Sequence, residues 1–197
     1  KALALAHDYQ AFSAIDRAFG QARSQSEFEL RELGFTASDV EHIQQLLSLL
    51  LYPHHALRAQ PNTLAANTSG QSGLWPYAIS GDYPILMVRV GSQEELTLVR
   101  QLLRAHAFWR NRNIKIDLVN LNLRGVGYEQ ELHAQLYRLI AEADAEAWLN
   151  RRGGIFLLRA DQMSAADRVL LETAARAILD GGEGLLAEQL APLRERP

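Results

Sequence analysis

The run Ile85–Val90 constrains the fold of this chain more than any other stretch. Its residues are apolar and partly β-branched, and Arg89 is the one interruption. A short unbroken run of this kind is typical of a strand that is covered on both faces. Pro84 stands at the start of the run, where its missing N–H does least harm to a sheet. We therefore predict a central, buried strand here.

Two further runs follow at distances that leave room for helices. Residues 114–120 alternate at first and then become apolar, and residues 155–158 form a short apolar run. Residues 96–109 and 131–149 carry apolar side chains at helical spacing, and a last long helix is expected from Ser164 to residues 180–182. The order βαβαβα predicts an α/β fold with a small three-stranded parallel sheet.

Two right-handed crossovers permit two orders of the strands in that sheet. Numbered along the chain, the strands can lie in the order 1-2-3 or in the order 2-1-3. The first strand has the most continuous apolar run, which favours a place in the middle. We therefore expect the order 2-1-3.

The chain ahead of the first strand is predicted to be helical and then irregular. Residues 2–33 place apolar side chains every three or four positions. Ser38 and Glu41 form a capping-box pattern that opens a further helix, which Pro53 ends. Accordingly, we divide the chain into a helical segment (1–52), an ordered linking loop (53–83) and a three-stranded parallel α/β unit (84–197), which together make one compact module.

The linking loop contains apolar residues that are expected to anchor it. An aperiodic stretch has few regular backbone hydrogen bonds, so its order must come from the burial of side chains. The candidate anchors are Leu57, Leu64, Leu74 and Trp75. We expect Trp75 to be largely buried and to pin the loop between the helical segment and the sheet.

Composition excludes several classes of function. The net charge of −3 provides no basic footprint, so no nucleic-acid partner is expected. No apolar run reaches the ~18 residues of a membrane span, so no direct insertion of this segment into a membrane is expected. Because the sequence begins in the middle of a helical pattern at Lys1, we expect a piece of a longer protein.

No motif for a cofactor or a metal ion is complete. Gly125 and Gly127 follow a predicted strand as in a dinucleotide fingerprint, but Gln130 occupies the position of the third glycine. The histidines of the predicted helices occur singly, without the spacing of a metal site. We therefore predict no cofactor, no metal site and no catalytic residue.

Four residues are candidates for ligand binding. Trp75 and Tyr77 supply the flat aromatic faces that sugar rings stack on, while Asp82 and Arg58 supply hydrogen-bonding groups near them. The alternatives are that the aromatic side chains belong to the core and that Asp82 has a turn or cap role, in which it accepts hydrogen bonds from main-chain N–H groups. A further possibility is a crevice at the carboxyl ends of the strands, lined by residues 120–122 and 159–161.

Several motifs resemble those of cyclic β-1,2-glucan synthases. The longest are Gly70-Gln-Ser-Gly-Leu-Trp75 and Ile79-Ser-Gly-Asp82, and Leu51-Tyr-Pro with Leu57-Arg58 precedes them. Later matches are His106 with Trp109, Asp117-Leu-Val119, Tyr128, Gly153-Gly-Ile155 and Arg159-Ala-Asp161. The resemblance runs from about Tyr9 to Leu190.

The resemblance implies a very large membrane protein with a glycosyltransferase-like half and a half similar to inverting phosphorylases of the cellobiose phosphorylase type. The matching segment of that family lies in the C-terminal half. The catalytic motifs of either half are absent from this sequence. The resemblance therefore implies a non-catalytic piece, located at the cytoplasmic face of the bacterial inner membrane.

Taken together, the sequence predicts a scaffold module that positions carbohydrate-processing domains on either side of it. Its expected partners are the flanking domains of the same polypeptide, and β-1,2-glucan is a further candidate partner. Two other classes of function stay open. One is a glucan-binding module that uses Trp75 and Tyr77, and the other is a small α/β enzyme with a crevice at the strand carboxyl ends.

Overall fold

A computed structural model describes residues 12–124 and 129–193, and the chain divides into two units, Lys1–Val40 and Glu41–Pro197. In the first unit, helix α2 (Phe12–Glu32) is continuous and has no buried residue, and its aromatic side chains are exposed. Gly34, with φ of +66°, follows this helix, as expected of a C-terminal glycine. The predicted start of this helix at residues 2–11 lies outside the described residues, as do Gly125–Tyr128.

The second unit is built on a parallel sheet. Strands β1 (Ile85–Val90), β2 (Asp117–Asn122), β3 (Ile155–Arg159) and β4 (Ala177–Asp180) lie in the order β3-β2-β1-β4. Every neighbouring pair is parallel, and Leu86 of β1 is opposite Leu118 on one side and Ala177 on the other. The α/β class and the parallel pairing of the predicted strands are thereby confirmed.

The number of strands was predicted wrongly. Residues 177–180 were expected to end the last helix, but α7 (Ala165–Ala174) ends before them and they form β4. Ile178 lies four residues after Ala174, and this spacing continues the helical period. The sequence pattern therefore does not show that the helix ends and a strand begins. The alternate burial of Ala177 and Leu179 is the strand signal that such a short run carries.

The expected order 2-1-3 is also wrong, because the first three strands follow one another as 1-2-3. Strand β1 is an interior strand, as its apolar run predicted, but β4 rather than β3 covers its second side. The missed fourth strand is thus the physical reason for the wrong order.

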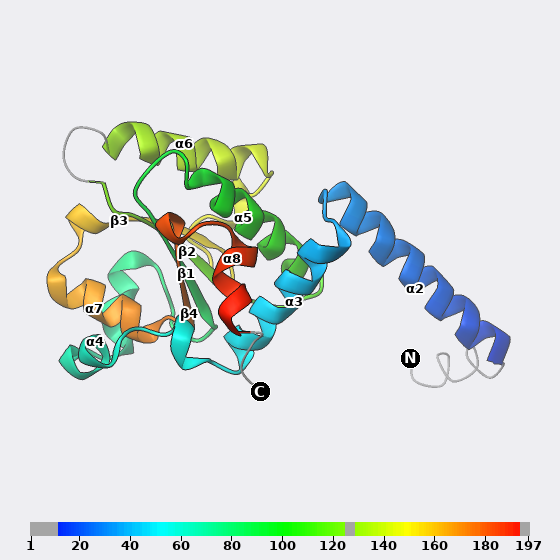
Figure 1. Ribbon diagram of the computed structural model, residues 1–197, viewed down its shortest axis with the longest axis horizontal. Helices are drawn as coiled ribbons and strands as arrows, with labels where there is room; N and C mark the ends of the chain where they lie inside the picture. Colours follow the sequence, from blue (N-terminus) through cyan, green and yellow to red (C-terminus); the bar gives the residue numbers. More distant parts are fainter. Residues whose placement is uncertain (1–11, 125–128, 194–197) are drawn as a thin grey trace. The chain divides into compact units, whose positions relative to one another are not determined.

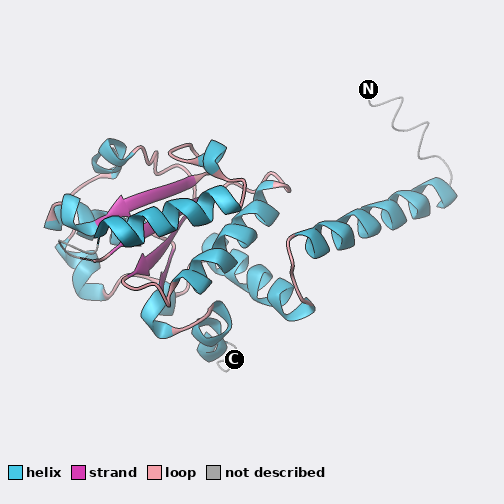
Figure 2. Cartoon of the chain, turned by 90° about the horizontal axis from the view of Figure 1, so that it is seen from above, coloured by secondary structure: helices cyan, strands magenta, loops and turns pink. Residues whose placement is uncertain are grey.

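Helices cover both faces of the sheet (Figures 1 and 2). Helices α5 (Leu96–Arg110) and α6 (Glu129–Glu142) pack side by side on one face. Helix α7, the short helix α4 (Pro61–Ala66) and the 3₁₀ helix η2 (Gln71–Tyr77) pack together on the other. Right-handed crossovers explain this division, because the chain moves one way from β1 to β3 and then returns across the sheet to β4.

The predicted linking loop contains short helices. These are η1 (His55–Leu57), α4 and η2, and they lead from α3 (Ala37–Leu51) to β1. Pro61 opens α4 at its first position, where the absence of its N–H costs nothing.

Further short helices complete the described chain, one between α6 and β3 and the others after β3 and β4: η3 (Glu146–Trp148), η4 (Ala160–Gln162), η5 (Gly181–Glu183), α8 (Leu186–Leu190) and η6 (Ala191–Leu193). Within residues 12–124 and 129–193, every helix is too short or too polar to cross a membrane.

Candidate functional site

Arg58 holds the end of a helix through both terminal nitrogens of its guanidinium. Its guanidinium donates hydrogen bonds to the main-chain oxygens of Thr173 (3.0 Å) and Ala175 (2.9 Å), where α7 ends. Carbonyl groups at a helix C-terminus lack partners within the helix, so a cation that donates to them stabilises that end. Arg58 thereby ties the segment after α3 to the segment before β4.

Trp75 is exposed, so the prediction that it is buried is wrong. Its side chain is 64% exposed, whereas the neighbouring Leu74 is only 2% exposed. Both belong to the 3₁₀ helix η2, in which residues three apart share a side. Leu74 and Tyr77 therefore face the core together, and Trp75 faces away from it.

Tyr77 lies at the border of the core. Its ring packs partly buried against the core below the sheet, and its hydroxyl donates a 2.9 Å hydrogen bond to Oδ2 of Asp167. Ser164 caps α7 by accepting from the N–H of Asp167. Burial, with a smaller effect of Asp167, raises the pKa of Tyr77. The bond to Asp167 fixes η2 against the start of α7.

Asp82 is the partner of two side chains. One of its oxygens accepts a 3.1 Å hydrogen bond from Nε2 of Gln71, and the other forms an ion pair with Arg152. Nε2 of Gln71 also donates to the main-chain oxygen of Ser80 at 2.7 Å. About half of the Asp82 side chain is exposed. These contacts tie the turn before β1 to Gln71 and Arg152. Both donors are side chains, whereas the structural alternative for Asp82 expected main-chain N–H donors.

The four candidate residues do not share a cavity. Tyr77 lines a hollow of about 290 Å³ next to the carboxyl end of β3, together with His133, Arg159 and Gln162. Asp82 lines another of about 470 Å³ at the amino end of β1. Arg58 lines a third, and Trp75 lines none of these three hollows.

The predicted crevice residues at the strand carboxyl ends bond mainly to the fold itself. Asn120 and Asn122 are fully buried on β2. Asn120 donates to the main-chain oxygen of Phe156 at 3.4 Å, and Asn122 accepts from the N–H of Arg124 at 2.9 Å. Beyond β3, Arg159 and Asp161 form an ion pair of 2.8 Å. Asn120 Oδ1 is buried without a hydrogen-bond partner.

A buried polar cluster at the amino end of the sheet, which was not predicted from the sequence, is formed by Asp117, His106 and the main chain of Gly153. Asp117 is completely buried at the start of β2, and its Oδ1 accepts a 2.7 Å hydrogen bond from the N–H of Gly153. Burial raises the pKa of this carboxyl to about 6. The sequence signal was an acid within an apolar strand together with the pair Gly153 and Gly154 on another segment.

His106 of α5 forms a hydrogen bond to the main chain of the same residue, Gly153. Its Nε2 lies 3.1 Å from the main-chain oxygens of both Ile116 and Gly153. Since carbonyl oxygens only accept, Nε2 carries the proton and donates to both. Burial lowers the pKa of His106 to about 4, so the imidazole is neutral at pH 7. This histidine is a structural residue of the core.

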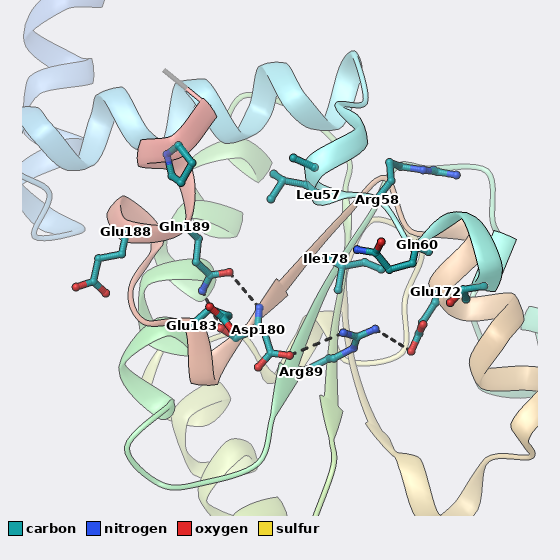
Figure 3. Close-up of a pocket in the computed structure, with 14 residues that line it drawn as sticks. Leu57, Arg58, Gln60, Arg89, Glu172, Ile178, Asp180, Glu183, Glu188 and Gln189 are labelled. Atoms are coloured by element: carbon teal, nitrogen blue, oxygen red, sulfur yellow. Dashed lines mark hydrogen bonds and ion pairs between the residues drawn. The ribbon is translucent and has the colours of Figure 1, made fainter. Parts of the chain in front are cut away.

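A polar hollow of about 520 Å³ lies at the carboxyl ends of β1 and β4, and we call it the β1–β4 hollow (Figure 3). Arg89 stands between two carboxylates, with Nη2 2.9 Å from Glu172 Oε1 and Nη1 3.8 Å from Asp180 Oδ2. Gln189 binds the backbone of Asp180, accepting from its N–H at 3.1 Å and donating to its oxygen at 2.8 Å. The remaining walls are Ala56, Leu57, Arg58, Ala59, Gln60, Thr63, Ile178, Glu183, Glu188 and Pro192.

The described part of the chain contains no cluster of side chains suited to bind a metal ion. No group of three or more acidic, histidine or cysteine side chains there could hold a metal ion.

The sequence was compared with those of known proteins, and one similar protein is a synthase. No family model matches the sequence. Over 176 residues, it is 34% identical to the cyclic beta-(1,2)-glucan synthase NdvB of Rhizobium meliloti (strain 1021). The match covers 86% of this chain and 6% of that protein, so the chain spans only a small part of its relative's length. The resemblance predicted from the motifs is confirmed as similarity to a segment of such a synthase.

Proposed function

We propose, on the premise that this chain is related to a segment of a cyclic β-(1,2)-glucan synthase, that it is a non-catalytic module of a larger synthase-like protein. In this proposal the module positions the carbohydrate-processing domains that flank it in the same polypeptide. On the resemblance stated above, we place it at the cytoplasmic face of the bacterial inner membrane.

One observation carries the proposal: the polar side chains that the sequence marked as candidates for a ligand or a crevice already hold the fold together. Arg58 caps α7, Asp82 joins Gln71 to Arg152, and Arg159 pairs with Asp161. The exposed Trp75 stands on a helix that the burial of Leu74 and the hydroxyl of Tyr77 hold in place. A rigidly held, exposed Trp is the kind of side chain that anchors protein interfaces.

The test uses the longer protein. Residues 41–193 are replaced by a flexible Gly/Ser linker in one variant, and Trp75→Ala is made alone in another. We expect the linker variant to lose cyclic glucan synthesis although its remaining domains stay folded. We expect Trp75→Ala to weaken the association of the module with its neighbours, measured by cross-linking. Full activity of the linker variant would refute the positioning role.

A second measurement addresses the absence of catalysis. The isolated chain, incubated with β-1,2-glucan and phosphate or with a sugar-nucleotide donor, should release no product above the blank. Turnover that disappears in an Asp82→Ala variant would contradict the proposal.

A glucan-binding module is the second candidate, and the exposure of Trp75 favours it. An exposed indole offers a flat apolar face to a sugar ring. In this case Trp75→Ala should abolish the affinity for β-1,2-glucan without changing the melting temperature. Unchanged glucan affinity in this variant would refute glucan binding at Trp75.

A further inference from the structure

We propose that the β1–β4 hollow binds a neutral saccharide. The hollow lies apart from Trp75, and the proposal goes beyond the positioning role. Only the choice of a β-1,2-linked ligand rests on the relation to a glucan synthase.

The place of the hollow in the fold is the first argument. In open parallel sheets, ligands bind outside the carboxyl ends of the strands. Arg89 and Asp180 stand near the carboxyl ends of β1 and β4 and are directly opposite each other in the register. Segments from five parts of the chain converge on them: η1 with α4, the end of β1, α7, β4 and the segment after it. A volume of about 520 Å³ is within the range of about 300–1,000 Å³ of small-molecule sites.

The hydrogen-bonding groups are the second argument. Arg89 offers donors, Glu172 offers acceptors, and the amide of Gln60 offers both. The side chains of Arg89 and Glu172 are 28% and 23% exposed, so they reach the hollow while they are paired with each other. Sugar hydroxyls both donate and accept, and they can therefore bond to all three groups. Ile178 adds an apolar surface for the C–H face of a pyranose ring.

The charges of the lining favour a neutral ligand over an anionic one. Arg58 and Arg89 contribute two positive charges, whereas the acidic lining residues Glu172, Asp180, Glu183 and Glu188 contribute four negative charges. A phosphate or a sugar nucleotide would be repelled by this excess. A neutral oligosaccharide meets no such repulsion.

The experiment is a titration of the purified, isotope-labelled chain, followed by amide chemical shifts. The probe is a β-1,2-linked glucose tetramer, and a β-1,4-linked tetramer and inorganic phosphate serve as comparisons. We expect saturable shifts in residues 56–63, 89 and 178–189 with the β-1,2 tetramer and none with phosphate. The affinity should be unchanged between about 50 and about 500 mM salt, because the ligand is neutral.

Two variants and one control complete the test. Gln60→Ala removes an exposed side chain that caps no helix, and Glu172→Gln keeps the shape of the carboxylate while it removes its charge. Gln60→Ala loses one hydrogen bond, and Glu172→Gln turns a charge-assisted hydrogen bond into a weaker neutral one. Each should weaken binding about 3- to 10-fold. Gln162→Ala, in the smaller hollow beside Tyr77, should leave the affinity unchanged. Melting curves of all three check folding.

The outcomes separate this proposal from the two functions proposed above. Absence of shifts in the hollow at saturating tetramer would overturn it, and so would equal affinities of Gln60→Ala, Glu172→Gln and the unsubstituted chain. Shifts confined to residues 72–78 would also overturn it and would support binding at Trp75 instead. A positioning role would survive any of these results, because its test measures the synthesis of the longer protein.

Discussion

The N–H of Gly153 donates a 2.7 Å hydrogen bond to Oδ1 of Asp117, which is completely buried. Burial raises the pKa of this carboxyl to about 6 from an ordinary value of 3.8. The folded state therefore holds this proton more tightly than the unfolded state does. The stability that the folded state gains by holding this proton is fully present below pH 3.8, and it is lost as the pH rises to about 6.

The first prediction concerns Asp117→Asn, which keeps an acceptor for Gly153 but cannot ionise. Between pH 4 and 6 the variant should gain stability relative to the unsubstituted chain, by on the order of 1–3 kcal/mol. Urea unfolding at several pH values measures the difference. A difference that stays constant across this range would show that Asp117 ionises normally.

The second prediction concerns His106, whose titration acts in the opposite direction. Burial lowers its pKa from 6.5 to about 4, so its contribution to stability is full above pH 6.5 and is lost as the pH falls to about 4. His106→Gln should remove this pH dependence, on the order of 1–3 kcal/mol. Because the two groups act in opposite directions over nearly the same range, the unsubstituted chain should show a flatter pH profile than either variant.

The third prediction concerns Gly154. A Cβ atom added there would lie 2.7 Å from the main-chain oxygen of Arg151 and closer still to that of Trp148. Neither is a flexible side-chain end, so Gly154→Ala should destabilise the fold by about 1–3 kcal/mol or more. Gly70→Ala is the matched control, because its Cβ would enter open space and its φ of −99° suits any residue. Equal melting temperatures for the two variants would contradict the prediction.

The fourth prediction compares two neighbours on η2. Leu74 is buried, so Leu74→Ala should cost about 2–5 kcal/mol of unfolding free energy. Trp75 is mostly exposed, so Trp75→Ala should change it by no more than about 0.5 kcal/mol. Chemical denaturation of both variants measures the difference. A large loss of stability in Trp75→Ala would show that the indole is buried after all.

The fifth prediction concerns the cap on α7. Arg58→Ala leaves two carbonyl groups without their donor and should cost about 1–3 kcal/mol. Arg58→Lys keeps the charge but not the fork of two donors, so it should recover only part of the loss. Thermal melts of the two variants next to the unsubstituted chain provide the measurement. Full recovery by lysine would mean that charge alone matters at this helix end.

Sequence reasoning located the elements whose patterns are long or strongly apolar. The interior strand β1 and the helix α5 lie where their patterns predicted. It failed at β4, because four residues are too few to show a period of two when a helix of suitable spacing precedes them.

The candidate site shows the same limit. Trp75 was predicted to be buried because its side chain is large. Which side of η2 it occupies depends on the three-residue period of a 3₁₀ helix, and composition does not reveal that helix. The β1–β4 hollow was missed because its walls come from segments far apart in the chain, and only the sheet order brings them together.

The order of the strands also sets the order of events during synthesis. One side of β1 pairs with β4, and Leu86 is opposite Ala177. This pairing cannot form until the ribosome has synthesised Ala177, long after Leu86. Until then the nascent chain carries an unpaired, apolar strand edge, which is the kind of surface that promotes aggregation. An expressed fragment should therefore include β4, since any truncation before residue 180 leaves β1 open along one side.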